Sequence, residues 1–575
     1  MSEESAAPST TPSAGPAAVP KAAHSLTISS SAVFGASLAT QLIGFIASIF
    51  LYKTIGLHTE GVALLGTAQL FLLIGSSING VGDLRLGTAY TYFLARGKSA
   101  TENTSTYLLV RMMMVGAAGL ILFAIAPLSI GGAQIVTNNT QLLALGIFLA
   151  LPLLWSFSTV YNALFIGQGD SVKAQYPSLV EAIARLPAII IVAFYFPTVL
   201  GITVAYAIGA VASTLFCLPA VVRLLRRFRW SEALRMFRFS WPLMGSLILS
   251  YLVTNMVPLI VNALLGPAAL SVFLAANGWR ILILSLPGAV ATPLFPYLAG
   301  LHQQEQYERI RRGTWQALRY SAMLLVPGVV ALVTYRSVFL NVFQSAAYAS
   351  QGALPLAILA VGALPLALSQ IMQASINAIG RQRLELYITS AQVVVLFGAV
   401  FLLMPPFGIL PRSQGLIAGS FAVLASSSVA LVLNTYFMET LIRVHIQPRS
   451  ILGILLSAAG GFFAMSQFNR FLPQGLYELA VGTILGFVAY FVLLIAIGEL
   501  TQQDVRQFAL SMGFSSGEAN SFARVCWRES TPGLLPIDLR RAPGLRPTEL
   551  PGTFVGDTEM PELGPLPSEP PPPEP

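Results

Sequence analysis

The sequence predicts an all-α polytopic membrane protein in which two parallel six-helix bundles surround a central cavity and one further helix pair follows. Three observations indicate this fold class. Hydrophobic residues make up 55% of the 575 positions and charged residues only 10%, which is more apolar than a soluble core requires. The apolar residues fall into runs of about 20 or more, the length that crosses the hydrocarbon layer as a helix. Two long series of such runs flank residues 223–238, which hold six arginines and one glutamate.

The apolar runs predict about 14 membrane-spanning helices. In chain order they cover residues 26–51, 61–94, 106–130, 141–166, 174–196, 198–222, 239–265, 268–301, 314–335, 352–379, 386–404, 415–439, 451–469 and 476–500. The runs 61–94 and 268–301 are too long for straight spans. We therefore expect tilt, or a break near Gly80 and Gly82 in the first run and near Pro287 in the second.

The basic residues of the loops predict the orientation. Six arginines in one short connection are hard to translocate, so residues 223–238 are expected in the cytoplasm. With both termini on that side, the cytoplasmic loops hold 16 lysines and arginines, whereas the outer loops hold four: Lys53, Arg336, Arg412 and Arg470. The sequence thus predicts a multi-pass protein of the inner (cytoplasmic) membrane with both termini in the cytoplasm.

The domain organisation follows from these spans. We expect a disordered cytoplasmic leader (1–25), a first six-helix bundle (26–222), a basic hinge (223–238), a second bundle (239–440), an extra hairpin (441–500) and a proline-rich cytoplasmic tail (501–575). The leader lacks the basic segment and short apolar run of a cleaved signal.

Two short matches suggest that the bundles arose by duplication. Ile55-Gly56 matches Leu265-Gly266 at an offset of 210, and residues 165–168 match residues 378–381 at an offset of 213. Six spans per unit is an even number, so the repeats would share one orientation and enclose a cavity between them.

Composition also excludes other classes. The net charge of +8 suggests nucleic acid, but the basic residues lie in short loops between spans, where they set orientation instead. Cys217 and Cys526 have no partners at metal-ligand spacing, so we expect neither a metal nor another cofactor.

Three local patterns resemble one known family. They are residues 83–89 (DLRLGTA) with the apolar stretch after them, residues 239–242 (FSWP) through 265–267 (LGP) to 294–298 (LFPYL), and residues 377–384 (NAIGRQRL). Together they resemble the polysaccharide and O-antigen flippases of the multidrug/oligosaccharidyl-lipid/polysaccharide exporter superfamily, over residues 26–500.

The resemblance implies a MATE-like, monomeric transporter, not an enzyme. It would move a polyprenyl-diphosphate-linked oligosaccharide to the outer leaflet by alternating access, within membrane lipid and beside other polysaccharide-assembly proteins. The sequence departs from the family pattern at Arg85, where glycine is common, and at Asn255 and Asn262, where an aspartate is common. The resemblance therefore does not imply coupling through an acidic group at these positions.

Charged residues within the spans are the candidate substrate-binding residues, because a charge at bilayer depth is costly and usually faces protein or water. Arg280 is the strongest: it lies deep in its span with no acid within one turn, and a guanidinium suits a diphosphate. The alternative is a structural arginine that binds the carbonyls of a broken helix. Glu181 and Arg185 stand four residues apart, which fits either a cavity pair or a structural pair.

Three further arginines are weaker candidates. Arg85 lies two residues after Asp83, so the two share a helical face only if the backbone is broken at the preceding glycines. Arg111 and Arg319 lie within a turn or two of the cytoplasmic ends of their spans. Extension of the side chain to the membrane surface is the ordinary explanation there, and a vestibule that admits substrate is the alternative.

Polar stripes could hold sugars. Gln41 shares a helix face with Ser30, Ser37 and Ser48, Asn162 with Trp155 and Thr159, and Gln373 with Gln370 and Asn377. Small polar residues also mediate helix packing in lipid, so each stripe has a structural alternative.

Two other functions compete. A multidrug or other lipid exporter of the same superfamily would share the architecture, but a proton or sodium site needs a buried carboxylate, and the first, fourth, seventh and tenth spans have none. A membrane glycosyltransferase or glycan polymerase needs acids or a base at an aqueous loop, and the short outer loops hold no carboxylate cluster.

Overall fold

The computed structural model describes residues 19–57, 59–95, 100–127, 136, 138–381, 383–404, 408–444, 447–468 and 475–500. Over these residues the secondary structure is helical, and 14 helices are long and apolar enough to cross a membrane. The predicted fold class and number of spans are confirmed. The tail and most of the leader lie outside the described residues.

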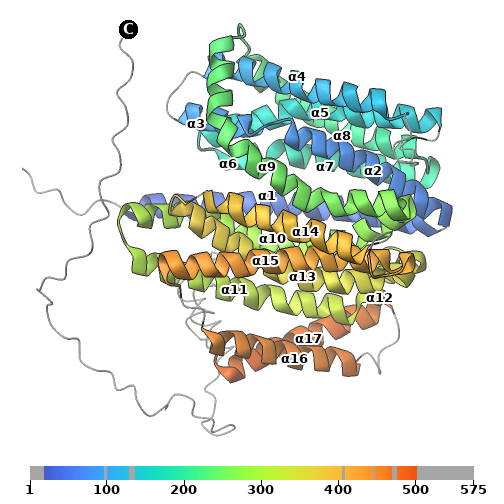
Figure 1. The fold of residues 1–575 in the computed structure, drawn as a ribbon, viewed down its shortest axis with the longest axis vertical. Helices are drawn as coiled ribbons and strands as arrows, with labels where there is room; N and C mark the ends of the chain where they lie inside the picture. Colours follow the sequence, from blue (N-terminus) through green and yellow to red (C-terminus); the bar gives the residue numbers. More distant parts are fainter. Residues whose placement is uncertain are drawn as a thin grey trace, which may run out of the picture. The chain divides into compact units, whose positions relative to one another are not determined.

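The helices form three groups along the chain (Figure 1). The first bundle holds α1 (Val19–Thr54), η1 (Ile55–Leu57), α2 (Thr59–Val81), α3 (Leu86–Ala95), α4 (Ala100–Ile125), α5 (Asn139–Gly167), α6 (Ser171–Ala174), α7 (Tyr176–Tyr195) and α8 (Val199–Val222). The second holds α9 (Trp230–Leu265), α10 (Pro267–Gln303), α11 (Tyr307–Thr334), α12 (Arg336–Phe343), α13 (Ala346–Ala378), α14 (Arg383–Leu403), η2 (Arg412–Gln414) and α15 (Gly415–Ile442). The hairpin consists of α16 (Pro448–Phe468) and α17 (Leu476–Ile497).

The break expected in the second span is present. α2 ends at Val81 and α3 begins at Leu86, and Leu84 and Arg85 between them have φ angles of 46° and 60°. A Cβ added to Gly80 would overlap the hydroxyl of Tyr251 on α9, so any larger residue there would require the tyrosine side chain to move. In the other long run no break is present near Pro287, because α10 continues as one helix from Pro267 to Gln303, and the tilt expected there as the alternative stays a prediction.

Two predicted boundaries were also wrong. α1 begins at Val19, inside the segment assigned to the leader, and α9 begins at Trp230, inside the segment assigned to the hinge. The second shift has a clear cause: Ala233, Met236 and Ser240 recur at helical spacing and are buried, so this stretch has a face to pack although it is too charged for a span. Only residues 223–229 connect the bundles outside a helix.

The hydrophobic core is shared by the bundles at one end and divided at the other. We call the end that carries residues 223–229 the hinge end. Away from it, one core cluster combines residues of α1, α2, α7 and α8 with residues of α9, α10, α13 and α15. Towards the hinge end, the described residues form one cluster within the first bundle plus the start of α9, and a separate one within the second bundle. The bundles are thus joined at the far end and packed independently at the hinge end.

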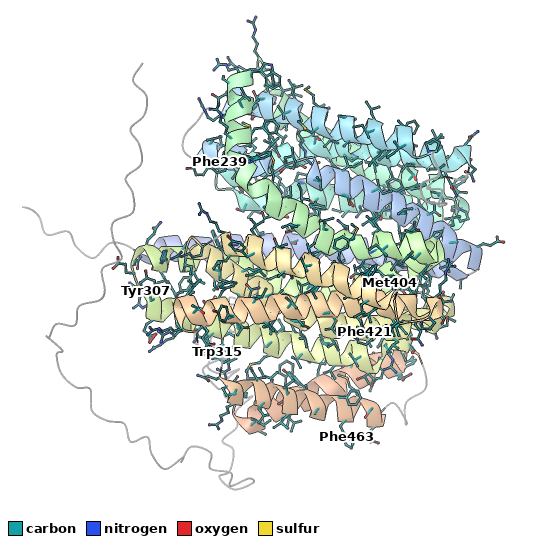
Figure 2. All side chains as sticks on the ribbon, viewed as in Figure 1. Phe239, Tyr307, Trp315, Met404, Phe421 and Phe463 are labelled. Carbon is teal, nitrogen blue, oxygen red and sulfur yellow. The ribbon has the colours of Figure 1, made fainter. Side chains whose placement is uncertain are left out.

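α9 connects the bundles across this division. Its first turns contact α3 and α4, and the helix also packs on α10, α14 and α15 (Figure 1). Phe239, labelled in Figure 2, stacks on Tyr92 of α3 with ring centroids 4.6 Å apart. The start of the second bundle is therefore attached to the first.

The turns after α5 and α13 support the duplication. After α5, the backbone N–H groups of residues 168, 169 and 170 donate to the carbonyls of residues 164, 166 and 165, respectively. After α13, the N–H groups of residues 379, 380 and 381 donate in the same pattern to the carbonyls of residues 375, 377 and 376. Every position differs by 211, and the φ angles of Gly169 and Gly380 are 83° and 79°. The equivalent glycine is thus Gly169, whereas the sequence match had aligned Gly167.

The extra hairpin packs on α11. The hydroxyl of Tyr490 on α17 donates to the Met323 carbonyl, and that of Tyr335, which follows α11, donates to the Met465 carbonyl of α16, both at 3.1 Å. Side chains on the other face of the hairpin, such as Phe463 in Figure 2, point away from the bundle. The hairpin is therefore an addition to the edge of the second bundle.

Candidate functional site

Arg280 lies on α10 between two parts of that helix: the buried apolar residues before it belong to the core that both bundles share, and those after it belong to the second bundle's own core. Its side chain is buried, with 9% of the residue exposed, and its Nε donates to Asn277 Oδ1 at 2.8 Å. Among the residues that the structure describes, no carboxylate forms an ion pair with it. A buried guanidinium with one neutral partner keeps donors and a full charge available to an anion.

The Glu181–Arg185 pair lies on the other side of α1 at the same level. Arg185 Nη1 is 3.3 Å from Glu181 Oε1, and both side chains are mostly buried. A Cβ on Gly44 of α1 would lie 3.7 Å from Arg185 Nη2, whereas the next residue, Phe45, contacts Trp279 beside Arg280 with ring centroids 4.6 Å apart. α1 therefore separates two arginines from opposite bundles, one neutralised and one not.

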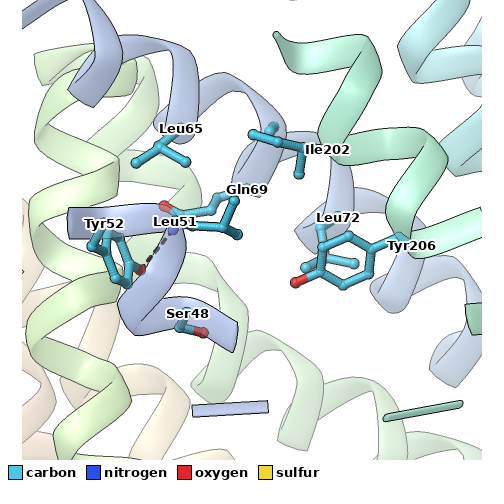
Figure 3. Close-up of a pocket in the computed structure, with 9 residues that line it drawn as sticks. Ser48, Leu51, Tyr52, Leu65, Gln69, Leu72, Ile202 and Tyr206 are labelled. Carbon is cyan, nitrogen blue, oxygen red and sulfur yellow. Dashed lines mark hydrogen bonds between the residues drawn. The ribbon is translucent and has the colours of Figure 1, made fainter. Parts of the chain in front are cut away.

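A small cavity lies between α1, α2 and α8 (Figure 3), and Arg185 contacts Tyr206, one of the residues that line it. The cavity has a volume of about 30 Å³, room for one or two water molecules. Gln69 and Tyr206 line it; Gln69 Nε2 donates to the Tyr52 hydroxyl at 2.7 Å, and the Arg185 guanidinium stacks on the Tyr206 ring at 4.8 Å. Sequence reasoning missed Gln69, although it is an amide within an otherwise apolar stretch of its span.

Both terminal nitrogens of Arg111 are held by the protein, while its Nε is buried without a hydrogen-bond partner among the described residues. Arg111 is 1% exposed, its Nη1 is 2.5 Å from Asp83 Oδ1, and its Nη2 donates to the Asn79 carbonyl at 3.0 Å and to Asn79 Oδ1 at 2.7 Å. The Tyr107 hydroxyl donates to the same Asp83 oxygen at 2.6 Å. The interpretation that Arg111 extends to the membrane surface was wrong: the break after α2 turns Asp83 towards α4, and the guanidinium is held there.

Arg85 occupies the same break but has different surroundings. Its carbonyl accepts from Ser240 Oγ at 3.1 Å, which ties the break to α9. Its side chain is half-buried, and its Nε is buried without a hydrogen-bond partner among the described residues. Arg85 thus keeps a donor available near the hinge end, close to the neutral Arg111–Asp83 pair.

Arg319 reaches the extra hairpin. Its Nη2 donates to the Glu499 carbonyl and its Nε is 3.5 Å from Glu499 Oε2, while Ser450 Oγ donates to the same carboxylate at 2.7 Å. Gly453 of α16 adjoins this carboxylate. The arrangement holds the start of α16 and the end of α17 against α11.

Some polar groups of the predicted stripes have hydrogen-bond partners within the protein, and others have none among the described residues. Asn162 Nδ2 donates to the Ala174 carbonyl at 3.2 Å and Asn377 Nδ2 to Glu385 Oε2 at 3.0 Å, so both stabilise turns at the hinge end, although Asn377 Oδ1 is buried without a partner among the described residues. Gln41 is half-buried, and its Oε1 is buried without a partner among the described residues. Gln373 is half-buried on α13. Gln41 therefore has a free acceptor one turn before Gly44, nearer the hinge end than the two arginines.

This geometry defines a class of protein: a two-bundle membrane transporter with basic and amide groups between its halves. A family model described as polysaccharide biosynthesis protein matches residues 90–351. A putative O-antigen transporter of Shigella flexneri is 21% identical over 393 residues, which cover 66% of this chain and 90% of that protein.

Solved structures share the fold. The lipid II flippase MurJ in an inward closed conformation superposes with a TM-score of 0.67 at 12% identity, covering 80% of this chain and 97% of that one. An inward-facing multidrug resistance MATE family transporter superposes with a TM-score of 0.56 at 15% identity, covering 72% and 98%.

These matches confirm the resemblance that the sequence suggested. The chain is a multi-pass membrane protein that is similar to polysaccharide flippases and transporters of the multidrug/oligosaccharidyl-lipid/polysaccharide exporter superfamily. The named relatives are transporters and flippases and not enzymes.

Proposed function

We propose that the protein moves a polyprenyl-diphosphate-linked oligosaccharide across the cytoplasmic membrane, from the hinge end to the far end, for surface polysaccharide synthesis. The observation that carries the proposal is Arg280: a buried guanidinium between two bundles, with no described carboxylate to neutralise it. The likeness to a putative O-antigen transporter and to a lipid II flippase supports the class of cargo.

The diphosphate supplies what Arg280 lacks. A phosphate oxygen can accept two parallel N–H bonds from a guanidinium, and such charge-assisted bonds are strong where water is excluded. Arg185 lies across α1 but is already paired with Glu181 at 3.3 Å, so it would orient its neighbours more than bind a second charge. Arg85 would attract the anion first, because it lies nearer the hinge end with an unpartnered Nε.

Alternating access follows from the divided core. With the hinge end in the cytoplasm, a core shared at the far end and divided at the hinge end would correspond to an inward-facing state. Opening outward requires the far-end contacts to separate, including the bond from Ser345 Oγ to the Gly56 carbonyl at 2.8 Å. The glycan would contact polar groups such as Gln41 and Gln373 on its way.

Replacement of Arg280 tests the proposal. Arg280→Ala should insert at normal abundance and reduce glycan export to background, whereas Arg280→Lys should retain partial export because it keeps the charge but loses the planar fork. Arg312→Ala, at an exposed arginine, is the control. Export and membrane abundance are measured together in cells that depend on the protein. Normal abundance with normal export for Arg280→Ala would refute the role of Arg280.

A multidrug exporter is the second candidate, because MATE transporters share the fold. The two carboxylates within the first-bundle polar clusters, Asp83 and Glu181, are each paired with an arginine, which does not favour a cation cargo. Deletion distinguishes the candidates: the flippase predicts accumulation of a lipid-linked oligosaccharide, identified by mass spectrometry, with unchanged drug sensitivity.

A further inference from the structure

The connection between the bundles carries an apolar stripe beside its arginines. Trp230, Leu234 and Trp241 have exposed fractions of 64%, 54% and 75%. Their spacings of four and seven residues put them on one face of α9. The apolar span of α9 begins only at Met244, so this stripe precedes the part of the helix that would cross the hydrocarbon. Tryptophan at such a position is typical of the boundary between lipid and water.

The opposite face of the same turns is fixed to the first bundle. Ala233, Met236 and Ser240 are buried in the core that α9 shares with α3, α4, α5 and α8. Two contacts fix the rotation of α9 about its own axis: the bond from Ser240 Oγ to the Arg85 carbonyl and the stacking of Phe239 on Tyr92. The stripe therefore stays exposed for a structural reason, since the helix cannot turn it inward.

The preceding turn is fixed as well. The backbone N–H of Arg226 donates to Ser105 Oγ at 2.5 Å and that of Arg229 to Thr106 Oγ1 at 3.4 Å, and both hydroxyls belong to buried residues at the start of α4. The side chains of Arg223, Arg226 and Arg227 are exposed, and no described carboxylate forms an ion pair with them. Three exposed cations thus immediately precede the apolar stripe, in a turn whose backbone is held by α4.

We propose that residues 223–241 form a binding surface for the headgroups of anionic phospholipids in the adjacent leaflet. The arginines would bind lipid phosphates while Trp230, Leu234 and Trp241 insert at the level of the upper acyl chains. Charge complementarity selects this occupant: the surface combines cations with an apolar stripe, the combination that an anionic membrane surface satisfies. This surface is separate from Arg280 and does not depend on the identity of the cargo.

Anionic lipid bound at this surface would affect the arrangement of the two bundles. α9 begins on the first bundle and packs on α10, α14 and α15 of the second. Anionic lipid bound at its start would hold that end of α9 at the membrane surface, and so would favour the arrangement in which the cores are divided at the hinge end.

Lipid titration of the full chain tests the proposal. The detergent-solubilised protein is titrated with phosphatidylglycerol or with phosphatidylcholine of the same acyl chains, and bound lipids are counted by native mass spectrometry. We expect phosphatidylglycerol to bind more tightly, and the triple variant Arg223→Gln, Arg226→Gln, Arg227→Gln to weaken its first binding constant at least ten-fold. Each basic residue near an anionic surface contributes a factor of about five to the binding constant, so the loss of three should exceed a ten-fold change.

The matched control removes the same charge elsewhere at the hinge end. Arg312, Arg381 and Arg383 are also exposed, and their triple replacement by glutamine should change the phosphatidylglycerol constant less than two-fold. Phosphatidylcholine binding should be the same in all three proteins. Equal loss in the hinge and control variants, or no preference for phosphatidylglycerol in the unmodified chain, would overturn the proposal.

Discussion

Arg111 and Arg280 are both buried arginines within spans, yet they have opposite surroundings. Arg111 is bound by Asp83 and by two oxygens of Asn79, while Arg280 has one amide oxygen from Asn277. Charge burial is therefore a poor guide to function by itself. What distinguishes the candidate site is a buried charge that no described carboxylate neutralises, because a guanidinium already paired with a carboxylate attracts an anionic substrate less.

The largest effect expected from this comparison is at Arg111. Arg111→Ala leaves Asp83 as a buried charge without its partner, and breaking a buried pair costs about 3–5 kcal/mol. We expect little folded protein in the membrane, whereas Arg280→Ala should be abundant and inactive. Abundance by immunoblot and unfolding in detergent measure the difference. An abundant Arg111→Ala variant that fails only in transport would place Arg111 in the substrate site and remove the contrast.

The pair can also be tested from its acidic side. Asp83→Asn keeps the shape and the bond from Tyr107 but leaves the Arg111 charge uncompensated, so we expect a loss of about 3 kcal/mol or more in the free energy of unfolding. The double variant Asp83→Asn, Arg111→Gln removes both charges and should recover part of that loss. If the double variant is as unstable as the sum of the single ones, the two residues do not act as a pair.

A smaller effect is expected at the extra hairpin. Glu499→Gln removes the charge of a buried carboxylate that faces Arg319 and Ser450, but the glutamine keeps an oxygen that can accept their bonds, and the Tyr490 and Tyr335 bonds to the hairpin remain. Because a hydrogen bond to a charged group contributes about 1 kcal/mol more than one to a neutral group, we expect a loss of about 1 kcal/mol in stability, faster proteolysis of the hairpin and unchanged transport per molecule. Loss of transport at normal abundance would show that the hairpin takes part in function.

The sequence predicted the parts of this molecule that depend on one helix at a time. Hydropathy runs specify the spans, and Gly80 and Gly82 specified the break after α2. The pairings could not be predicted, because they join residues far apart in the chain. Asp83 turns towards Arg111 only because of the break, and Glu499, placed near the end of the last span, pairs with Arg319 only once the hairpin has docked. Arg280 was identified from depth and the absence of a nearby acid, two properties of its own helix.

The smallest predicted effect concerns the duplicated turns. Gly380 has a φ of 79°, and a Cβ there would meet nothing within 4 Å, so Gly380→Ala tests backbone strain alone. Because the left-handed conformation costs an L-residue about 1–2 kcal/mol, we expect a loss of that size. Gly398→Ala is the matched control: it also has open space but lies within α14, where alanine stabilises a helix by up to about 1 kcal/mol. Gly169→Ala should match Gly380→Ala, since the two turns share one hydrogen-bond pattern. Unequal losses at the two glycines, measured by unfolding in detergent, would show that the repeats have diverged in stability although their turns still share one geometry.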